Sequence, residues 1–266
     1  MRNLIKLAVS DVDGTLVNKD KRVTPLTREA IKTFQESGGS FTLATGRIER
    51  SAIPFCRDLD IRVPVILYNG ARIVDPLTEE VLWEKSLHKD DLDRALELRS
   101  KYSFDYLIYS DGEAFVFKRS DAVKLFEKGD GYKCTLITDP LMFSEREVTK
   151  ILMIGDNQYF SGFSDDFYGT RKNPAPLVQS ESNYLEILPA GVNKGTALDK
   201  LQEILGLKKE NIVCFGDNMN DIEMLQNAGT GIAMGNALSL VKEAADIVTS
   251  DHNNDGVGRI LNSLHL

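Results

Sequence analysis

The stretch Ile5–Leu16, with the sequence IKLAVSDVDGTL, decides the fold class of this chain. Its first half, Ile5–Ser10, is apolar enough to form a buried strand. Two aspartates, Asp11 and Asp13, follow directly in a turn that contains glycine. A buried strand that ends in polar residues ahead of a helix is typical of an α/β protein, in which ligands bind at the carboxyl ends of parallel strands. We therefore take this stretch as the first strand of a parallel sheet.

The same alternation of strand and helix continues on both sides of a long middle stretch. Before it, the pattern predicts helices and strands in turn: helix Leu26–Ser37, strand Phe41–Ala44, helix Arg50–Leu59 and strand Val65–Tyr68. After it, the pattern predicts helix Lys194–Leu205, strand Ile212–Phe215, helix Asp221–Ala228, strand Thr230–Met234 and a final helix to about Leu264. Short apolar strands separated by helices predict a doubly wound, Rossmann-like parallel sheet with helices on both faces.

The middle of the chain has a different character. After the turn Asn69-Gly70, short strands joined by turns such as Ser110-Asp111-Gly112 predict antiparallel hairpins. We therefore predict two domains, a core made of residues 1–83 and 189–266 and an α+β domain of residues 84–188 inserted into it.

One part of the inserted stretch, Asp156–Val178, contains two glycines and two prolines and departs from a regular helix-then-strand pattern. It also holds a group of aromatic residues. We expect these to fill the core of the inserted domain rather than to stack on a substrate: Tyr159, Phe160, Phe163, Phe167 and Tyr168.

The composition excludes several classes of protein. The 266 residues carry 32 Lys+Arg and 40 Asp+Glu, a net charge of −8, which argues against a nucleic-acid partner because phosphate backbones are bound by basic faces. No apolar run exceeds four residues, whereas a membrane helix needs about 20. The three cysteines and three histidines show no spacing typical of a disulfide framework or a zinc site. We expect a cytoplasmic protein with no membrane segment and no obligate protein partner.

Three segments that follow predicted core strands carry polar residues. They are Asp11–Thr15, Thr45-Gly46-Arg47 and Gly216–Asp221. Because the carboxyl ends of parallel strands meet at one edge of a sheet, we expect the three segments to converge there.

The converging segments bring together four carboxylates, those of Asp11, Asp13, Asp217 and Asp221. Two unit charges 4 Å apart repel by about 4 kcal/mol at an effective dielectric constant near 20, so a positive charge is needed. Oxygen ligands without imidazole or thiolate favour Mg²⁺, and Lys194 at the start of its helix offers a second positive charge. A cation, a lysine and free backbone N–H groups together suit a phosphate group.

Each segment has a simpler interpretation when it is taken alone. The Asp-x-Asp-Gly pattern is often only a turn, and it is not an EF-hand because Leu16 stands where that loop requires glycine. Thr45 ahead of Gly46 is more often a helix cap than a ligand contact. Gly229–Gly235 resembles a dinucleotide-binding loop, but its third glycine comes one residue late and a strand replaces the turn. It is the conjunction of three segments at predicted strand ends that favours a phosphate-handling site.

These residues resemble the motifs of the haloacid dehalogenase superfamily of phosphohydrolases. The first to fourth motifs are matched in chain order by Asp11-Val12-Asp13-Gly14-Thr15-Leu16, Thr45 in Ala-Thr-Gly-Arg, Lys194, and Gly216-Asp217-x-x-Asn220-Asp221. Three further stretches resemble the Cof-type branch, which carries a type IIB cap domain: Asn69-Gly70-Ala71, Asn193–Leu198 and Asn254–Val257.

The resemblance implies a role for each matched residue. Asp11 would attack phosphorus to form an aspartyl-phosphate, and Asp13 would protonate the leaving oxygen and later deprotonate the attacking water. Mg²⁺ would be held by Asp11, the backbone carbonyl of Asp13 and Asp217, with Asp221 behind them. The phosphoryl oxygens would be held by six residues: Val12, Thr45, Gly46, Asn193, Lys194 and Asn220.

We therefore predict a Mg²⁺-dependent phosphatase that hydrolyses small phosphorylated metabolites, sugar phosphates foremost, through an aspartyl-phosphate. One alternative is a phosphotransferase or phosphomutase on the same framework, which would pass the phosphoryl group to a second hydroxyl. Another is a receiver-like signalling domain that accepts a phosphoryl group. The inserted domain and the general acid Asp13 argue against the receiver, which needs neither.

Overall fold

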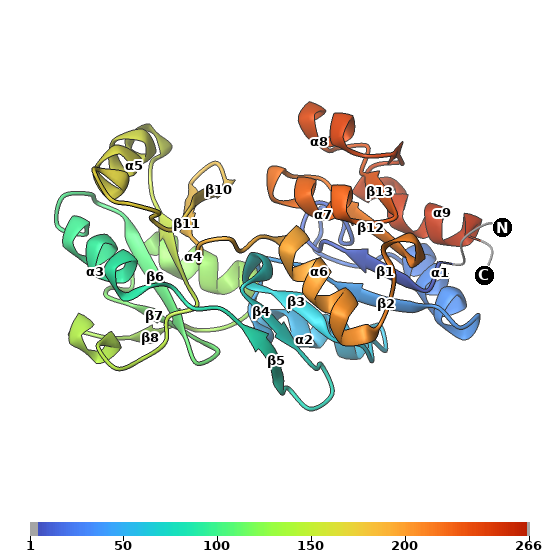
Figure 1. Cartoon of the computed structure of the whole chain (residues 1–266), viewed down its shortest axis with the longest axis horizontal. Helices are drawn as coiled ribbons and strands as arrows, with labels where there is room; N and C mark the ends of the chain where they lie inside the picture. Colours follow the sequence, from blue (N-terminus) through green and yellow to red (C-terminus); the bar gives the residue numbers. More distant parts are fainter. Residues whose placement is uncertain (1–4, 265–266) are drawn as a thin grey trace. The chain divides into compact units, whose positions relative to one another are not determined.

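The computed structural model describes residues 5–264 and divides the chain into two compact units, whose elements are labelled in Figure 1. The first unit takes in the described residues up to Gly46, then Ala52–Trp83, then the chain from Asn193 onward. The second takes in Arg47–Ser51 and Glu84–Val192. The domain limits that we expect from the sequence, residues 84 and 188, stay a prediction.

The first unit is built on a five-stranded sheet in the order β14-β13-β12-β1-β2. Its strands are β1 (Leu7–Ser10), β2 (Ser40–Leu43), β12 (Ile212–Gly216), β13 (Thr230–Ala233) and β14 (Ile247–Val248). All neighbouring strands are parallel. The chain runs from β1 to β2 on one side, while β12 lies on the other, so β1 marks the point where the strand order reverses. Ligands of open α/β sheets bind outside the strand ends at such a point.

Helices cover both faces of this sheet (Figure 1). They are α1 (Pro25–Glu36), α2 (Glu49–Asp58), α6 (Lys194–Leu205), α7 (Ile222–Asn227), α8 (Ser239–Ala244) and α9 (Gly256–Ser263). On one face, Val9 of β1 packs in a cluster with Leu198 of α6 and Leu225 of α7. Successive residues of a strand point to opposite faces, and α1 packs beside β2 and against α9. The predicted doubly wound α/β fold is confirmed.

Local sequence explains where the two longest helices of this unit begin. Helix α1 begins after Thr24, whose side chain accepts a hydrogen bond from the Thr27 N–H, and Pro25 occupies its first turn. Helix α6 begins after Asn193, which forms a reciprocal capping box with Thr196. Gly206 ends α6 in the left-handed conformation, at φ 64°. The capping box fixes the start of α6, and with it the position of Lys194.

The sequence predicts one final helix that runs to about Leu264, and this prediction is wrong. The structure instead has α8, the short strand β14 and then α9. The side chain of Asp246 accepts a hydrogen bond from the Gly231 N–H, which ties the chain to β13 just before β14 begins. Asp255 at φ 59° then forms the turn into α9. Pairing with β13, far away in the sequence, stabilises a two-residue strand that periodicity does not reveal.

A small antiparallel sheet extends the first unit. It contains β3 (Val65–Leu67), β4 (Arg72–Val74) and β5 (Val81–Glu84), in that order. A single bridge between Ala44 and Ile66 connects β3 with the end of β2. The turn between β3 and β4 therefore lies beside the end of β2.

The second unit contains a six-stranded sheet in the order β10-β11-β9-β6-β7-β8. Its strands are β6 (Asp105–Ser110), β7 (Glu113–Val116), β8 (Thr135–Leu136), β9 (Lys150–Ile154), β10 (Leu177–Glu181) and β11 (Tyr184–Ile187), and its longer helices are α3 (Lys89–Leu98), α4 (Asp121–Asp130) and α5 (Phe160–Tyr168). Pairing is antiparallel throughout except between β7 and β8. This is the antiparallel α+β character that the sequence predicts for the middle of the chain.

The irregularity expected for Asp156–Val178 is confined to part of the stretch: it contains helix α5 and the start of β10, and residues 169–176 between them form neither helix nor strand. Gly162 lies within the helix, and Gly169 follows its last residue at φ 46°. The aromatic residues of α5 lie in the hydrophobic core of this unit, as predicted: Phe160, Phe163 and Phe167 are buried and Tyr168 packs against them. Tyr159 differs, since it is 54% exposed.

Within residues 5–264, no helix has the length and apolar character needed to cross a membrane.

Candidate active site

A buried lysine joins two of the predicted aspartates in the first unit. The Nζ atom of Lys194 lies 2.6 Å from Oδ1 of Asp11 and 2.6 Å from Oδ1 of Asp221. Lys194 is 1% exposed and Asp221 is 0% exposed. The structure therefore brings together three chain segments that are far apart in the sequence, at the carboxyl ends of β1 and β12 and the start of α6.

The sheet places Asp11 and Asp217 side by side. Asp11 follows β1, and its N–H donates to the carbonyl of Phe215 in β12 at 3.0 Å. The hydroxyl of Thr15 donates to Oδ1 of Asp217 at 2.7 Å. Gly14, at φ 84°, lies so close that a Cβ atom there would be 2.4 Å from Oδ2 of Asp217. This position therefore requires glycine for two reasons, the left-handed backbone and the close approach of a carboxylate.

Asp221 is anchored by donors on both of its oxygens. Oδ1 accepts from Lys194, and Oδ2 accepts from the backbone N–H groups of Asp217 at 2.9 Å and Asn218 at 3.0 Å. A carboxylate used in this way holds the loop after β12 in place. It leaves Asp11 and Asp217 as the carboxylates with oxygens available to a ligand.

The donor set fits a hard divalent cation. Asp11, Asp217 and Asp221 each offer a carboxylate oxygen, and these atoms lie within 4.8 Å of one another. The set contains only oxygen, which suits Mg²⁺ better than zinc or copper. The three carboxylates face one ammonium group, so the cluster carries excess negative charge that a cation would balance. Asp11 and Asp217 would hold that cation, and Asp221 would lie behind them.

The electrostatics show how strongly these charges interact. Burial raises the pKa of Asp11 well above its ordinary value, Lys194 acts in the opposite direction, and Asp221 and Asp217 raise it further. Burial also raises the pKa of Asp217 to about 6, while the hydrogen bond from Thr15 lowers it and the Asp221 charge raises it. For Lys194, burial lowers the pKa, but Asp11 and Asp221 outweigh this effect, and the pKa lies above its ordinary value. The lysine therefore stays charged.

Asp13 lies apart from this buried cluster. Its side chain is 34% exposed, and its Oδ1 lies 2.6 Å from Nζ of Lys21. Its backbone pairs with Val17 in an isolated bridge, which closes the loop after β1. Between the two aspartates, Val12 is fully buried, and its carbonyl accepts from the N–H groups of Leu16 and Val17.

The predicted phosphoryl-binding residues Thr45, Gly46 and Asn220 meet around Asn69. The carbonyl of Thr45 accepts from the Asn69 N–H at 2.9 Å. The side-chain oxygen of Asn69 accepts from Nδ2 of Asn220 at 3.0 Å, and a Cβ on Gly46 would lie 3.0 Å from the same oxygen. Asn69 thus connects the loop after β2 with the loop after β12.

The start of α6 is joined to the same group of loops. Gly70, at φ 103°, approaches so closely that a Cβ there would lie 2.3 Å from the carbonyl of Asn193. The side chain of Asn193 accepts from the Thr196 N–H at 2.7 Å, so in this structure it caps the helix. The sequence Asn69-Gly70, a predicted turn and part of a stretch that resembles the Cof-type branch, therefore connects the loop after β2 with the start of α6.

Sequence reasoning assigns no role to Asn236, although it contacts this site. Its Nδ2 donates to the carbonyl of Gly14 at 2.9 Å and lies 3.4 Å from Oδ2 of Asp217. Its Oδ1 accepts from the His252 N–H. The sequence signal that could have identified Asn236 is its position in the loop after β13, because Asp217 lies in the loop after the neighbouring strand β12.

The Asn254–Val257 stretch links two helices of this unit. The carboxylate of Asp255 accepts from the hydroxyls of Thr24 and Thr27, at the start of α1. Asp255 therefore joins the first turns of α1 and α9, and it lies outside the carboxylate cluster.

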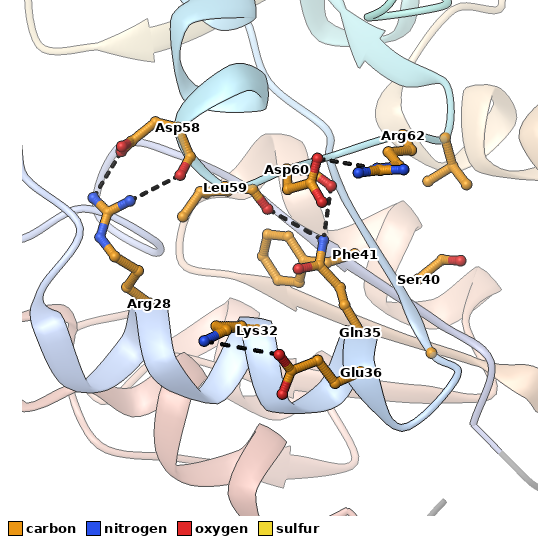
Figure 2. Close-up of a pocket in the computed structure, with 12 residues that line it drawn as sticks. Arg28, Lys32, Gln35, Glu36, Ser40, Phe41, Asp58, Leu59, Asp60 and Arg62 are labelled. Carbon is orange, nitrogen blue, oxygen red and sulfur yellow. Dashed lines mark hydrogen bonds and ion pairs between the residues drawn. The ribbon is translucent and has the colours of Figure 1, made fainter.

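A hollow of the first unit, about 560 Å³ in volume, lies at the amino end of β2 beside α1 and α2. Figure 2 shows its charged side chains paired with one another: Arg28 with Asp58, Lys32 with Glu36 and Arg62 with Asp60. None of the residues predicted to form the active site lines this hollow.

The carboxylate cluster with its buried lysine, at the carboxyl ends of β1 and β12, is the arrangement expected of a phosphoryl-handling hydrolase. A family model described as haloacid dehalogenase-like hydrolase matches residues 8–261. The chain belongs to this family, and the expected superfamily and Cof-type branch are confirmed.

Named relatives agree with that assignment. A 5-amino-6-(5-phospho-D-ribitylamino)uracil phosphatase, YwtE of Bacillus subtilis, is 32% identical over 282 residues that cover 98% of each chain. An HMP-PP phosphatase of Klebsiella pneumoniae is 31% identical and covers 90% of this chain and 87% of its own. A crystal structure of a haloacid dehalogenase-like hydrolase from Bacteroides thetaiotaomicron is 28% identical with a TM-score of 0.90, covering 98% of this chain and 100% of its own. The predicted enzyme class, a phosphatase of this superfamily, is confirmed.

Proposed function

We propose that this chain is a Mg²⁺-dependent phosphatase that hydrolyses phosphate monoesters of small metabolites, sugar and polyol phosphates foremost. The observation that carries the proposal is the buried Lys194 between Asp11 and Asp221, with Asp217 beside them. A carboxylate 2.6 Å from a buried ammonium, at a point where a cation can bind, is suited to attack an anionic phosphate.

The first half-reaction would proceed at Asp11. A carboxylate oxygen of Asp11 forms a bond to phosphorus, and the bond from phosphorus to the ester oxygen breaks. Asp13 donates a proton to the departing oxygen, which leaves as an alcohol. Lys194 and the backbone N–H groups around Val12 would hold the phosphoryl oxygens, together with Thr45, Gly46, Asn193 and Asn220.

The second half-reaction would regenerate the enzyme. A water attacks phosphorus, Asp13 takes a proton from it, and the bond between phosphorus and Asp11 breaks to release inorganic phosphate. Mg²⁺, when bound by Asp11, Asp217 and the backbone carbonyl of Asp13, would neutralise charge on the phosphoryl group. Lys194 opposes the effect of burial by lowering the pKa of Asp11, which favours the ionised carboxylate that the next substrate requires.

Substrate choice would come from the second unit. The residues assigned to the core handle only the phosphoryl group, which every substrate shares, so discrimination needs other contacts. We therefore propose that residues 84–188 act as the substrate-specificity domain. The YwtE relative is named for a substrate with a phosphorylated ribityl chain, which supports a polyol phosphate as the first class to try.

A panel of phosphorylated metabolites tests the proposal, with released phosphate as the measurement and a sugar acceptor added in parallel. Hydrolysis that is unchanged by the acceptor supports the phosphatase, whereas transfer to the acceptor supports the phosphotransferase alternative. Mass spectrometry of the quenched enzyme should locate one phosphoryl group on the peptide that contains Asp11. A phosphoryl group on any other residue would refute the mechanism.

A further inference from the structure

The second unit contains a pocket of about 370 Å³ between the end of α3 and the start of β6. Aromatic and cationic side chains dominate its lining: Arg99, Tyr102, Phe104, Tyr106, Phe117 and Lys118. All of them lie within one unit, and none belongs to the phosphate-handling residues described above. The pocket is large enough for a small organic molecule.

A buried hydroxyl in this lining has no partner. Tyr106 is 3% exposed, and within residues 5–264 its hydroxyl makes no hydrogen bond. Burial raises the pKa of Tyr106 above its ordinary value, and the next largest effects come from Arg99 and Tyr102, which also line the pocket. The hydroxyl therefore stays protonated and remains a hydrogen-bond donor in a pocket that these residues also line. Buried polar groups in proteins are almost always paired, so an unpaired donor at a pocket indicates a ligand or water.

The guanidinium group of Arg99 also lines this pocket, and within residues 5–264 no carboxylate pairs with it. The Cζ atom of Arg99 is 3.8 Å from the centre of the Phe117 ring, which is a face-to-face stack. In the described part of the chain, this guanidinium makes no hydrogen bond or ion pair. A stacked guanidinium keeps its N–H donors free at its edges, where they match the two oxygens of a carboxylate.

The local charge favours an anion with a single charge. Nζ of Lys118 lies 3.0 Å from Oδ1 of Asp105, so these two charges balance each other. The other oxygen of Asp105 accepts from the Ser120 hydroxyl at 2.6 Å. Across the part of the chain that the structure describes, no carboxylate pairs with the charge of Arg99.

The remaining lining favours a flat apolar body. The rings of Tyr102 and Phe104 are stacked, with centroids 5.6 Å apart and an angle of 20° between their planes. Aromatic rings pack well against other rings.

We propose that this pocket binds a small aromatic carboxylate, with Arg99 and Tyr106 donating to the carboxylate and the ligand ring lying against Tyr102 and Phe104. The site is separate from the proposed phosphatase chemistry and does not depend on it.

Calorimetric titration of the full chain with benzoate tests the proposal, with benzamide as the neutral ligand of the same shape. We expect benzoate to bind at least about tenfold more tightly than benzamide, because only benzoate pairs with Arg99. Arg99→Met should weaken benzoate binding by about tenfold or more, and Tyr106→Phe by about fivefold. Because the Tyr106 hydroxyl has no partner among residues 5–264, Tyr106→Phe should not lower Tm.

Two matched variants control for general effects. Arg146 also lies over a phenylalanine ring, that of Phe115 at 5.6 Å, but it is outside the pocket. Tyr159 is an exposed tyrosine of the same unit. Arg146→Met and Tyr159→Phe should leave benzoate affinity unchanged. The proposal is overturned if benzoate does not bind up to about 10 mM, if benzamide binds equally well, or if Tyr106→Phe and Arg99→Met bind benzoate like the wild type.

Discussion

The two ends of the central sheet differ in how their charges are balanced. At the amino end of β2, the charged side chains around the hollow form ion pairs, as between Arg28 and Asp58 (Figure 2). At the carboxyl ends of β1 and β12, Lys194 is the one ammonium group that the described residues place against Asp11 and Asp221, and a third carboxylate, that of Asp217, lies beside them. Both ends belong to the same sheet of the first unit. The comparison teaches that the end with unbalanced buried charge is the end suited to bind a cation and a phosphate.

The largest effect should follow from Asp11→Asn. The substitution keeps the size of the side chain but removes the nucleophile, so phosphate release should fall by at least about a thousandfold. Circular dichroism should show an unchanged fold. Asp20→Asn, an exposed aspartate a few residues further along the chain, serves as the matched control and should keep wild-type activity. Residual activity of Asp11→Asn above a few per cent would remove Asp11 from the proposed role.

The next largest effect should come from removing the metal. EDTA should abolish phosphate release, and added Mg²⁺ should restore it, because the excess negative charge at the carboxyl ends then has its counter-ion. Ca²⁺ should restore little, since it prefers more ligands at longer distances. A steady rate in EDTA-treated, metal-free buffer would show that the carboxylate cluster works without a cation.

A smaller effect should follow from loosening Asp217. Thr15 and Asn236 both contact its carboxylate, and loss of such supporting hydrogen bonds typically weakens metal binding by about 10- to 100-fold. Thr15→Val, which removes the 2.7 Å bond, should raise the half-saturating Mg²⁺ concentration more than Asn236→Ala does. Asn227→Ala, at a half-buried asparagine of the same unit that bonds Asp199, is the control. Equal Mg²⁺ requirements in all four proteins would show that these contacts do not position Asp217.

The smallest effect should come from the amino end of the sheet. Asp58→Asn breaks an ion pair whose side chains are 41% and 52% exposed. Pairs of this kind contribute about 0.2–1 kcal/mol, so the free energy of unfolding should fall by no more than that, and phosphate release should not change. Denaturant unfolding and the standard assay measure both. A large loss of activity in Asp58→Asn would contradict the difference between the two ends.

The features of the fold and of the candidate site that can be predicted from the sequence are those determined by residues close together in the chain. Lys194–Leu205 is recognised as a helix because its apolar spacing and the following Gly206 are both local signals. Asp11 and Asp217 are recognised because polar residues follow apolar strands. Their convergence follows from the general behaviour of parallel sheets.

The parts that sequence reasoning missed depend on contacts between distant segments. Strand β14 has two residues and is stabilised by β13. Asn69 and Asn236 act through hydrogen bonds to loops that the chain reaches only after folding. The place of Asp221 behind the metal stays a prediction; in the structure its carboxylate accepts from Lys194 and from two backbone N–H groups.

The most direct test of the account is the change in Tm on adding Mg²⁺, measured for the wild type and for Asp217→Asn. In EDTA, the variant should be more stable than the wild type, because one of three mutually repelling carboxylates is gone. Mg²⁺ should then raise the Tm of the wild type, by a stabilisation of about 2.7 kcal/mol at a hundredfold excess over Kd, and leave the Tm of the variant almost unchanged. A wild type that does not respond to Mg²⁺, together with a variant less stable than it in EDTA, would contradict the claim that unbalanced charge at the carboxyl ends forms the active site.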